Sequence, residues 1–421
     1  MLLKNRLFCG LGSSIEWFDF ALYGFFGSIF AEKFFPPTYG HKWVALMVTY
    51  LIFAVGYVAR PLGGLIFGYL GDKYGRLFSL RITPLLITLF TTLMAFLPTY
   101  HSIGEMAIVI LIVIRIFQGL LLGGEFAGNI VYLCESSTKW KYFWGSIGSC
   151  TGSFGIILAS LIASFFYFLF SHSFMYDYGW RIAFLCSLPL GIISFYARLR
   201  MLESPEFKAQ PSSKNPIIES ALRYKWLLFL CIGLVYLHAT SFYFVFIFLP
   251  VFLNKFRHLP ESAALLHNSL FLIIHLGFIP IFGVIVNLMG GLRSQITIAL
   301  AFLFFSIPIF YWVAYGTPNQ IIISLFLFSV MTAVNAGIIP GLISSLIPTE
   351  VRYTVLALAF NIGFGVFGGI TPFIGIYLVK TSGNILLPGV YLTMVALVTF
   401  VVSVMAIKQR KAHEIRKLSA A

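Results

Sequence analysis

Charged side chains are scarce in this chain. They make up 10% of its 421 residues, whereas hydrophobic side chains make up 59%, and the mean hydropathy is +0.94. A soluble domain has about 25% charged and about 45–50% apolar residues. The composition therefore excludes an ordinary soluble protein and indicates a chain that crosses the membrane several times.

Cysteine is also rare, and its positions are isolated. The five cysteines lie in or beside separate apolar runs without paired spacing, so we expect neither a disulfide framework nor a zinc site. The sequence contains no phosphate-binding loop, no cluster of metal ligands and no nucleophile paired with a base. We therefore predict no catalytic residues, no metal and no cofactor, and we expect neither an enzyme nor a pump driven by ATP.

Long apolar runs are what the sequence has in abundance. A helix needs about 20 apolar residues to cross a hydrocarbon core about 30 Å thick. Twelve such runs occur, at residues 8–31, 44–70, 79–98, 105–133, 143–170, 181–202, 226–253, 263–288, 294–315, 319–346, 353–379 and 387–407. We predict an all-α integral membrane protein with twelve transmembrane helices. The first run carries Glu16 and Asp19, so we expect it to be the first span rather than a cleaved signal peptide.

Basic residues outnumber acidic residues, 28 to 14. If both termini are cytoplasmic, the twelve spans place 20 lysines and arginines on the cytoplasmic side and 6 outside, with Arg60 and Arg115 within spans. The positive-inside rule predicts this asymmetry. The net charge of +14 therefore sets the topology and favours anionic lipid headgroups, and we expect no nucleic-acid partner.

The longest polar interruption separates six spans from six. It reads ESPEFKAQPSSKNPIIESALRYK and occupies residues 203–225. We therefore predict an N-terminal six-helix bundle at 1–202, a cytoplasmic linker at 203–225, and a C-terminal six-helix bundle with a short basic tail at 226–421.

One internal repeat supports two related halves. The loop GYLGDKYGR follows the second span, and GVIVNLMGG follows the eighth at the equivalent connection. The matching positions are Gly68 with Gly283, Asp72 with Asn287, and Gly75 with Gly290.

These segments carry a resemblance to a known family. GYLGDKYGR resembles the cytoplasmic loop signature of the major facilitator superfamily. Within it, the metabolite:proton symporter family is similar in EWFDFALYG, RPLGGLIFGYLGDKYGR, RIFQGLLLGGEFAG, GWRIAF, LESPEF and PTEVRYTVLALAFNIGFGVFGGITP, in that order. The resemblance is strongest to proline/betaine transporters, in LPLGIISFYARLR, CIGLVYLHATSFYF and LVKTSGNILLPGVYL.

The resemblance implies the major facilitator fold of two pseudo-symmetric six-helix bundles. It also implies a proton-coupled symporter that imports a small polar metabolite by alternating access. We favour a zwitterionic osmolyte or amino acid such as proline or betaine; an organic acid (citrate, a dicarboxylate, 2-oxoglutarate or a shikimate-like acid) is the alternative cargo. A membrane sensor that does not transport is the alternative class. We expect a functional monomer in the bacterial inner membrane, with a small-molecule substrate, protons and membrane lipid as partners.

Two positions depart from the family pattern. Asn287 stands where the second loop signature usually has an acid, which weakens a matching charge clamp in the C-terminal half. After Glu135 the family usually has a proline and an Arg-Gly pair, but this chain reads SSTKWK at 136–141, which leaves lysines to supply the charge.

Ionisable groups inside the spans are few. A charged side chain at mid-bilayer costs about 2.5–3.5 kcal/mol, so it usually faces a cavity or a partner. With a rise of about 1.5 Å per residue, Asp19 lies about 17 Å from the inner end of span 1, and Arg115 lies about 15 Å from the outer end of span 4. Both are near the midplane, and the superfamily fold makes these two spans neighbours.

We predict that Asp19 accepts the coupling proton beside Arg115. The arginine favours the ionised carboxylate and burial favours the protonated acid, so a cavity that alternately closes and hydrates loads and releases the proton. Proton-coupled sugar porters of the superfamily are similar in using an acid of span 1 and an arginine of span 4. A static ion pair is the structural alternative. Glu16, one turn below, is a second candidate for proton or substrate contact, or else a packing partner of Arg60.

The fourth span carries one polar face. Its members recur at intervals of three and four residues: Arg115, Gln118, Leu122, Glu125 and Asn129. A polar stripe on an otherwise apolar helix is expected to face the protein interior.

The first loop signature predicts a conformational gate. Its glycines allow a tight turn, Asp72 suits the N-terminus of a neighbouring helix, where the dipole favours an anion, and Arg76 is placed to meet a carboxylate. Simple solvation of the loop is the alternative. Further expected members of this gating network are Glu125, Glu135, Arg198 and Arg200, with Glu135 paired to Arg198 or Arg200, and Glu350 near Arg352.

Polar and aromatic side chains of the spans supply candidate substrate contacts. The candidates are Trp17, Tyr23, Arg60, Gln118, Tyr243 and Asn361. Trp17 and Tyr23 are suited to box a quaternary ammonium by cation–π attraction. Arg60 suits a carboxylate, or else a structural role beside the Pro61 helix distortion. For Tyr243 and Asn361 an interhelical hydrogen bond is an equal alternative.

Overall fold

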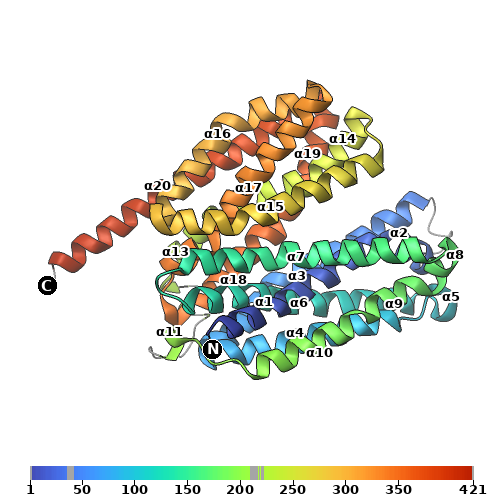
Figure 1. The fold of residues 1–421 in the computed structure, drawn as a ribbon, viewed down its shortest axis with the longest axis horizontal. Coiled ribbons are helices and arrows are strands. Elements are labelled where there is room, and N and C mark those ends of the chain that lie inside the picture. Colours follow the sequence, from blue (N-terminus) through green and yellow to red (C-terminus); the bar gives the residue numbers. More distant parts are fainter. Residues whose placement is uncertain (1, 36–41, 209–216, 218, 220–221, 420–421) are drawn as a thin grey trace. The chain divides into compact units, whose positions relative to one another are not determined.

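The structure, a computed structural model, describes residues 2–35, 42–208, 217, 219 and 222–419. Every regular element among these residues is helical (Figure 1). Ten helical segments of the described chain are long and apolar enough to cross a membrane. Two further long helices, α1 (Leu2–Phe25) and α3 (Lys42–Lys73), account for the first two predicted runs. The prediction of an all-α membrane protein is confirmed.

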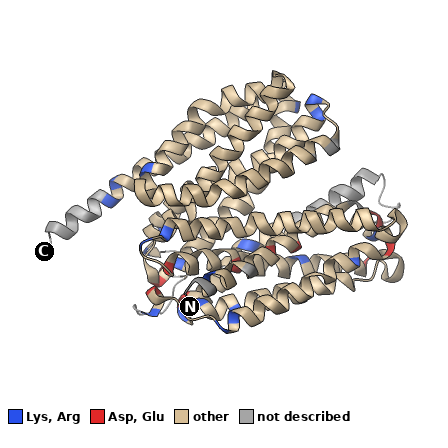
Figure 2. Cartoon of the chain, viewed as in Figure 1, with Lys and Arg blue, Asp and Glu red and all other residues tan. Residues whose placement is uncertain are grey.

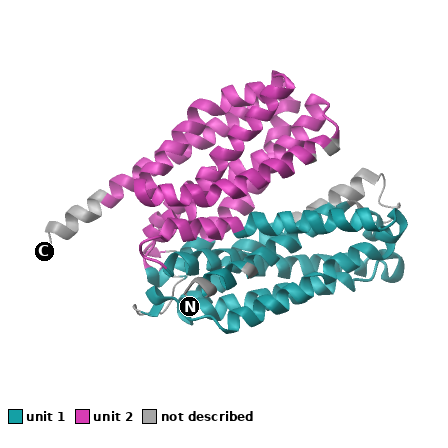
Figure 3. Cartoon of the chain, in the orientation of Figure 1, with its two compact units in different colours: residues 1–136, 151–217, 349–357 teal, residues 137–150, 218–348, 358–421 magenta. Residues whose placement is uncertain are grey.

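The chain forms two compact units, which Figure 3 colours separately. Unit 1 comprises Met1–Ser136, Thr151–Ile217 and Thr349–Ala357, and unit 2 comprises Ser137–Cys150, Ile218–Pro348 and Leu358–Ala421. The short segments 137–150 and 349–357 therefore belong to a different unit from the residues before and after them. The domain limits expected from the sequence, at 1–202, 203–225 and 226–421, stay a prediction.

Unit 1 is built mainly from the first half of the chain. Its helices are α1, α2 (Gly27–Phe34), α3, α4 (Arg76–Ala95), α5 (Tyr100–Ile103), α6 (Met106–Glu135), most of α7 (Lys141–Leu169), α8 (His172–Phe174), α9 (Trp180–Leu185), α10 (Ser187–Leu199) and α11 (Pro205–Lys208). The short 3₁₀ turn η4 (Thr349–Val351) and the first residues of α18 (Arg352–Ile362) also belong to it.

Glycines bring α3 and α6 into backbone contact inside unit 1. A Cβ atom on Gly63 would lie 1.7 Å from the carbonyl oxygen of Leu120, and one on Gly119 would lie 2.0 Å from that of Gly56. Small residues permit such close approach of helices in a membrane. This contact fixes the two helices that carry the intramembrane arginines.

The core of unit 1 at the α1–α2 junction is aromatic. Phe26 and Phe30 pack against Phe184 of α9, and Phe30 and Phe34 pack against Trp180. Burial of these large rings provides much of the packing between the first and sixth spans. The acids of α1 lie on the N-terminal side of this aromatic cluster.

Unit 2 is built mainly from the second half of the chain. Its helices are α13 (Lys225–Tyr243), α14 (Leu249–Arg257), α15 (Glu261–Met289), α16 (Gly291–Tyr315), α17 (Pro318–Leu346), the last residues of α18, α19 (Gly369–Ser382), α20 (Leu387–Ser419) and the first residues of α7. Helix α16 packs along α17 and α20, and α15 packs along α17.

Three spans in the described chain contain a π-helical turn. These turns are η2 (Met175–Gly179), η3 (Phe244–Phe248) and η5 (Gly363–Gly368). Within unit 2, η5 packs against α13, and a Cβ on Gly368 would lie 2.7 Å from the ring of Tyr243. Such turns inside α-helices are frequent at functional sites.

Candidate functional site

Buried charge is confined to one unit of the described chain. Most of each helix in Figure 2 carries no charged residue. The buried acidic and basic side chains are Glu16, Asp19, Arg60, Asp72, Arg76, Arg115, Glu125, Glu135, Arg198 and Arg352. All of them belong to unit 1, whereas the buried polar side chains described in unit 2 carry amide, hydroxyl or imidazole groups. Unit 1 therefore holds the candidate proton-coupling site.

Asp19 is buried and accepts a hydrogen bond from α6. The Nε2 atom of Gln118 donates to Oδ2 of Asp19 at 2.8 Å and lies 3.4 Å from the hydroxyl of Thr91 on α4. The other carboxylate oxygen, Oδ1, is buried and has no hydrogen-bond partner among the described residues. The acid is thus half-satisfied, because Gln118 fills one oxygen and leaves the other open.

Glu16 is equally buried but lacks such support. Within the described chain, neither of its carboxylate oxygens has a hydrogen-bond partner. The charges that act on it electrostatically are Asp19 on its own helix, Arg60 on α3, Glu125 on α6 and Arg198 on α10. Buried carboxylates normally accept hydrogen bonds, so Glu16 is the exception at this site.

Two arginines lie against aromatic rings near these acids. The guanidinium carbon of Arg115 lies 3.5 Å from the ring centroid of Tyr23, and that of Arg60 lies 5.5 Å from the ring of Trp17. Arg115 also interacts electrostatically with Asp19. Each ring that the sequence offers to a substrate cation therefore already faces a cation of the chain.

The stripe expected on the fourth span lies on the buried face of α6. Each member is at most 1% exposed: Arg115, Gln118, Leu122, Glu125 and Asn129. At its far end the Nδ2 atom of Asn129 donates to the hydroxyl of Thr151 on α7 at 3.0 Å. The expectation that this polar face points inward is confirmed.

Glu125 and Arg198 form a buried bidentate ion pair. Nη1 of Arg198 donates to Oε2 of Glu125 at 2.8 Å, and Nη2 donates to Oε1. Nη2 also donates to the carbonyl oxygen of Cys9 at 2.6 Å. Room for the guanidinium comes from Gly12, where a Cβ atom would lie 2.2 Å from Nη2. The pair joins α6 to α10, and the same arginine contacts α1 at Cys9 and Gly12.

This pair corrects one expectation from the sequence. Arg198 was expected to pair with Glu135, but its partner is Glu125, which lies ten residues earlier on α6. The long arginine side chain reaches past Gly12 instead of ending at the helix terminus. Arg200, the other expected partner, is an exposed residue at the end of α10.

Asp72 receives the first turn of α18. Its carboxylate accepts hydrogen bonds from the backbone N–H of Tyr353 at 3.1 Å and of Thr354 at 2.8 Å, and from the Thr354 hydroxyl at 2.7 Å. Arg76 donates to the same carboxylate. The contact with a helix N-terminus that the loop signature predicts is therefore present, and the helix dipole favours the anion there.

Arg76 and Glu135 are the centre of an ion-pair network in unit 1. Two nitrogens of Arg76 donate to Glu135, at 3.0 and 3.2 Å. Glu135 also accepts from Nη1 of Arg352 at 2.8 Å and from the hydroxyl of Ser204 at 2.5 Å. Arg352 in turn donates to Glu206 at 2.5 Å. Arg76 meets a carboxylate as expected, whereas Ser204 and Glu206 follow only from the fold.

Arg6 supplies a cation where the family pattern is interrupted after Glu135. Its Nε atom donates to the hydroxyl of Ser136 at 2.8 Å, and its Nη2 atom donates to the carbonyl oxygen of Ser136 at 2.6 Å. A positive charge is favourable at a helix C-terminus such as that of α6. From the sequence we expected lysines to take this role, and the distant Arg6 gave no local signal.

The predicted contacts of unit 2 lie beside π turns. Tyr243 directly precedes η3, Asn361 lies two residues before η5, and both side chains are buried. Two buried amides of unit 2, Gln295 and Asn335, have no hydrogen-bond partner on either polar atom among the described residues. Gln295 escaped notice in the sequence because it is only the second residue of its predicted run, 294–315.

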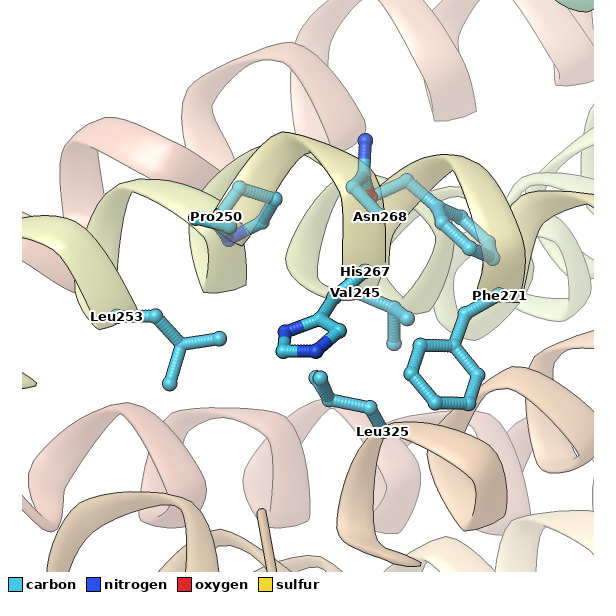
Figure 4. Close-up of a pocket in the computed structure, with 9 residues that line it drawn as sticks. Val245, Pro250, Leu253, His267, Asn268, Phe271 and Leu325 are labelled. Atoms are coloured by element: carbon cyan, nitrogen blue, oxygen red, sulfur yellow. The ribbon is translucent and has the colours of Figure 1, made fainter. Parts of the chain in front are cut away.

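A small pocket of unit 2 is not a substrate site. It lies between η3, α14, α15 and α17, and Figure 4 shows the ring of His267 between Val245, Leu253, Phe271 and Leu325. Its volume of about 10 Å³ holds roughly one water molecule. The Nδ1 atom of His267 has no hydrogen-bond partner within the described residues, so one water suits the pocket better than a metabolite.

A family model and two curated relatives match most of the chain. A family model described as Major Facilitator Superfamily matches residues 10–372. The proline/betaine transporter of Escherichia coli K12 is 31% identical over 424 residues, which cover 96% of this chain and 83% of the relative. A putative proline/betaine transporter of Staphylococcus aureus MSSA476 is 30% identical over 409 residues, which cover 95% and 87%.

Solved structures share the fold at low sequence identity. The proton:xylose symporter XylE bound to 6-bromo-6-deoxy-D-glucose has a TM-score of 0.79 and 17% identity, with 97% of this chain and 95% of that chain covered. The human organic anion transporter MFSD10 has a TM-score of 0.70 and 12% identity, with 96% and 99% covered. At these identities the likeness concerns the fold alone.

Proposed function

Since the chain belongs to the Major Facilitator Superfamily and is a membrane transporter rather than an enzyme, we propose that it is a proton-coupled symporter that imports a small polar metabolite by alternating access. Its fold is the twelve-span fold of that superfamily. Symporters of this kind are driven by the proton gradient and need no cofactor, in agreement with the expectation from the sequence.

The observation that carries the proposal is the pair of buried acids on α1. Glu16 and Asp19 are each 1% exposed. Of these two acids, Asp19 accepts a hydrogen bond from a described residue and Glu16 does not. Acids inside a membrane span are costly and typically serve proton relays or ion pathways. We assign Asp19 as the coupling acid, Arg115 as its charge partner and Glu16 as a second proton carrier.

The proposed substrate contacts are assigned unit by unit. In unit 1 they are Trp17, Tyr23, Arg60 and Gln118, and in unit 2 they are Tyr243 and Asn361. The buried arginines and the hydrogen-bonded amide of unit 1 support contacts with a carboxylate. The π turns beside Tyr243 and Asn361 support a functional role for unit 2.

The proposed gate consists of the ion-pair networks of unit 1. Its members are Asp72, Arg76, Glu125, Glu135, Arg198 and Arg200. The bonds that hold the first turn of α18 to Asp72, and those that join Arg352 to Glu135, support this role. They would break when segment 349–357 is released during transport. Arg200, which is exposed at the end of α10, is included on the sequence pattern alone.

The favoured cargo is a zwitterion such as proline or betaine. Relatives at 30–31% identity carry the name proline/betaine transporter, and they support this choice. The two buried arginines of unit 1 favour the alternative, an organic acid, because each offers a planar pair of donors to a carboxylate. We place the protein in the bacterial inner membrane with both termini cytoplasmic, acting as a monomer on a small-molecule substrate and protons.

Uptake into proteoliposomes tests the proposal. We expect saturable uptake of radiolabelled proline or betaine, with accumulation raised at least tenfold by a pH gradient that is acidic outside. Asp19→Asn should abolish that accumulation while partly retaining exchange, because the neutral amide cannot carry a proton. Asp177→Asn is the matched control, since Asp177 is 54% exposed and pairs with Lys33.

Four results would contradict parts of the proposal. Accumulation that ignores the gradient, or an unchanged ratio in Asp19→Asn, would remove the coupling. Saturable uptake of citrate or a dicarboxylate, without uptake of proline or betaine, would reverse the choice of cargo. A folded protein that takes up none of these solutes would favour a sensor.

A further inference from the structure

Tyr353 occupies a slot lined by glycines in unit 1. The residue is fully buried in the first turn of α18, and its hydroxyl donates to the carbonyl oxygen of Gly124 at 2.9 Å. A Cβ atom on Gly71 would lie 2.1 Å from the ring, and one on Gly128 would lie 2.0 Å from the hydroxyl oxygen. A Cβ on Gly68 would lie 2.8 Å from Cα of the next residue. These glycines therefore make the room that Tyr353 fills.

Tyr142, which is partly exposed, occupies a second slot lined by glycines, in unit 2. A Cβ atom on Gly291 would lie 2.4 Å from the Tyr142 hydroxyl oxygen, and one on Gly341 would lie 2.7 Å from Tyr142 Cα and Cδ1. A Cβ on Gly283 would lie 2.2 Å from the hydroxyl oxygen of Ser146, one turn further along α7, and 3.2 Å from Cα of Phe143. The backbone N–H of Tyr142 donates to Oδ1 of Asn287 at 3.3 Å.

The two slots share three features. Each tyrosine is the second residue of its helix and follows a basic residue, Lys141 in α7 or Arg352 in α18. Each donates its backbone N–H to one member of the repeated loop pair, Asn287 or Asp72. The first glycine of the loop faces the first turns of the helix in both units: Gly68 faces Thr354, and Gly283 faces Ser146. A glycine of α6 or α17 faces the tyrosine itself.

The two slots differ in charge. Asp72 offers a carboxylate that accepts three bonds from Tyr353 and Thr354, whereas Asn287 offers a neutral amide oxygen at a longer distance. A carboxylate at a helix N-terminus is worth about 0.3–1 kcal/mol from the dipole alone. The α18 contact is therefore the stronger of the two.

We propose that Tyr353 and Tyr142 are a matched pair of latches, one charged and one neutral. Each latch seats the first turn of its helix in a glycine slot, and the filling of the slot sets how often that turn is released. The segments that carry them, 349–357 and 137–150, are the two that belong to a different unit from their chain neighbours. Release of each segment is then a local event with its own rate.

Hydrogen–deuterium exchange of the full-length protein in nanodiscs tests the pair. Tyr353→Phe should speed exchange in the first turn of α18 about fivefold, the factor for one hydrogen bond of about 1 kcal/mol. Gly128→Ala should speed exchange at least tenfold in 349–357 only, and Gly341→Ala should do so in 141–150 only. Gly277→Ala is the matched control, because a Cβ there meets nothing within 4 Å.

The neutral latch has a separate test. Asn287→Asp should slow exchange at the start of α7 about threefold, because a carboxylate replaces the amide at that helix N-terminus. The pair is overturned if Gly128→Ala and Gly341→Ala exchange like Gly277→Ala, or if either speeds exchange evenly along the chain. Exchange is measured without substrate or gradient. A negative transport assay therefore contradicts symport but not the latches, and a negative exchange result contradicts the latches but not symport.

Discussion

Glu16 and Asp19 share one face of α1 and equal burial, yet their hydrogen bonding differs. Gln118 donates to Asp19, and no described residue donates to Glu16. A buried carboxylate without donors is expensive, so a neutral side chain of the same shape should replace Glu16 with little cost in stability. The same replacement removes any proton that Glu16 carries.

Glu16→Gln should therefore separate function from stability. We expect the free energy of unfolding to change by no more than about 1 kcal/mol, while gradient-driven accumulation falls at least tenfold. Thermal unfolding and uptake in proteoliposomes measure the two quantities, and Glu105→Gln, at an exposed acid, is the control. A large loss of stability in Glu16→Gln would mean that the native carboxylate is ionised and paired.

Glu125 poses the opposite case, because its carboxylate is fully paired. Glu125→Gln would leave the buried guanidinium of Arg198 without its anion. Breaking one side of a buried ion pair costs about 3–5 kcal/mol, whereas breaking the exposed Lys33–Asp177 pair with Asp177→Asn should cost at most about 1 kcal/mol. Unfolding by heat or denaturant compares them.

A double variant distinguishes loss of the ion pair from a nonspecific loss of stability. In Glu125→Gln combined with Arg198→Met, neither position of the pair carries a charge, so we expect part of the lost stability to return. If the two losses simply add, the pair does not act as a unit.

At the scale of elements, hydropathy was sufficient to predict the spans. Each span must bury its backbone bonds across the hydrocarbon core, and this requires long apolar helices. The three π turns were not predictable, because one extra residue in a turn leaves hydropathy unchanged. Their positions depend on contacts such as that of Gly368 with Tyr243.

Helical periodicity predicted the site only within each helix. Intervals of three and four residues predicted that Arg115, Gln118 and Glu125 share a buried face of α6, and they do. Partners on other helices were beyond such reasoning, because Arg198 is 73 residues from Glu125 and Arg352 is 217 residues from Glu135. Only tertiary packing brings such residues together.

The glycine contact between α3 and α6 allows an element-scale prediction. Gly63→Ala would place a methyl group against the Leu120 backbone, which cannot yield as a side chain can. We expect a loss of about 1–3 kcal/mol in the free energy of unfolding, as for an overpacked core. Gly24→Ala in α1, where a Cβ meets nothing within 4 Å, should lose less than about 0.5 kcal/mol. Equal unfolding temperatures would contradict the close contact.

At the scale of the whole molecule, the two halves share a fold but not a charge distribution. The repeated loop has Asp72 in one copy and Asn287 in the other, and the buried charges of the described chain all belong to unit 1. The repeat was visible in the sequence at three positions. The matching tyrosines were not, because they lie far from the loops that receive them. Proton coupling is accordingly expected to depend on residues of unit 1.

Net charge movement distinguishes the two cargo classes. A zwitterion imported with one proton carries one positive charge inward, whereas an organic monoanion imported with one proton carries none. An elementary charge that moves through 100 mV gains about 2.3 kcal/mol, which corresponds to roughly 40-fold accumulation. We therefore expect an inside-negative potential of about 100 mV, imposed by potassium diffusion through valinomycin, to raise proline or betaine accumulation by roughly that factor at equal pH. Uptake that is saturable but indifferent to the potential would contradict zwitterion symport and favour an organic anion.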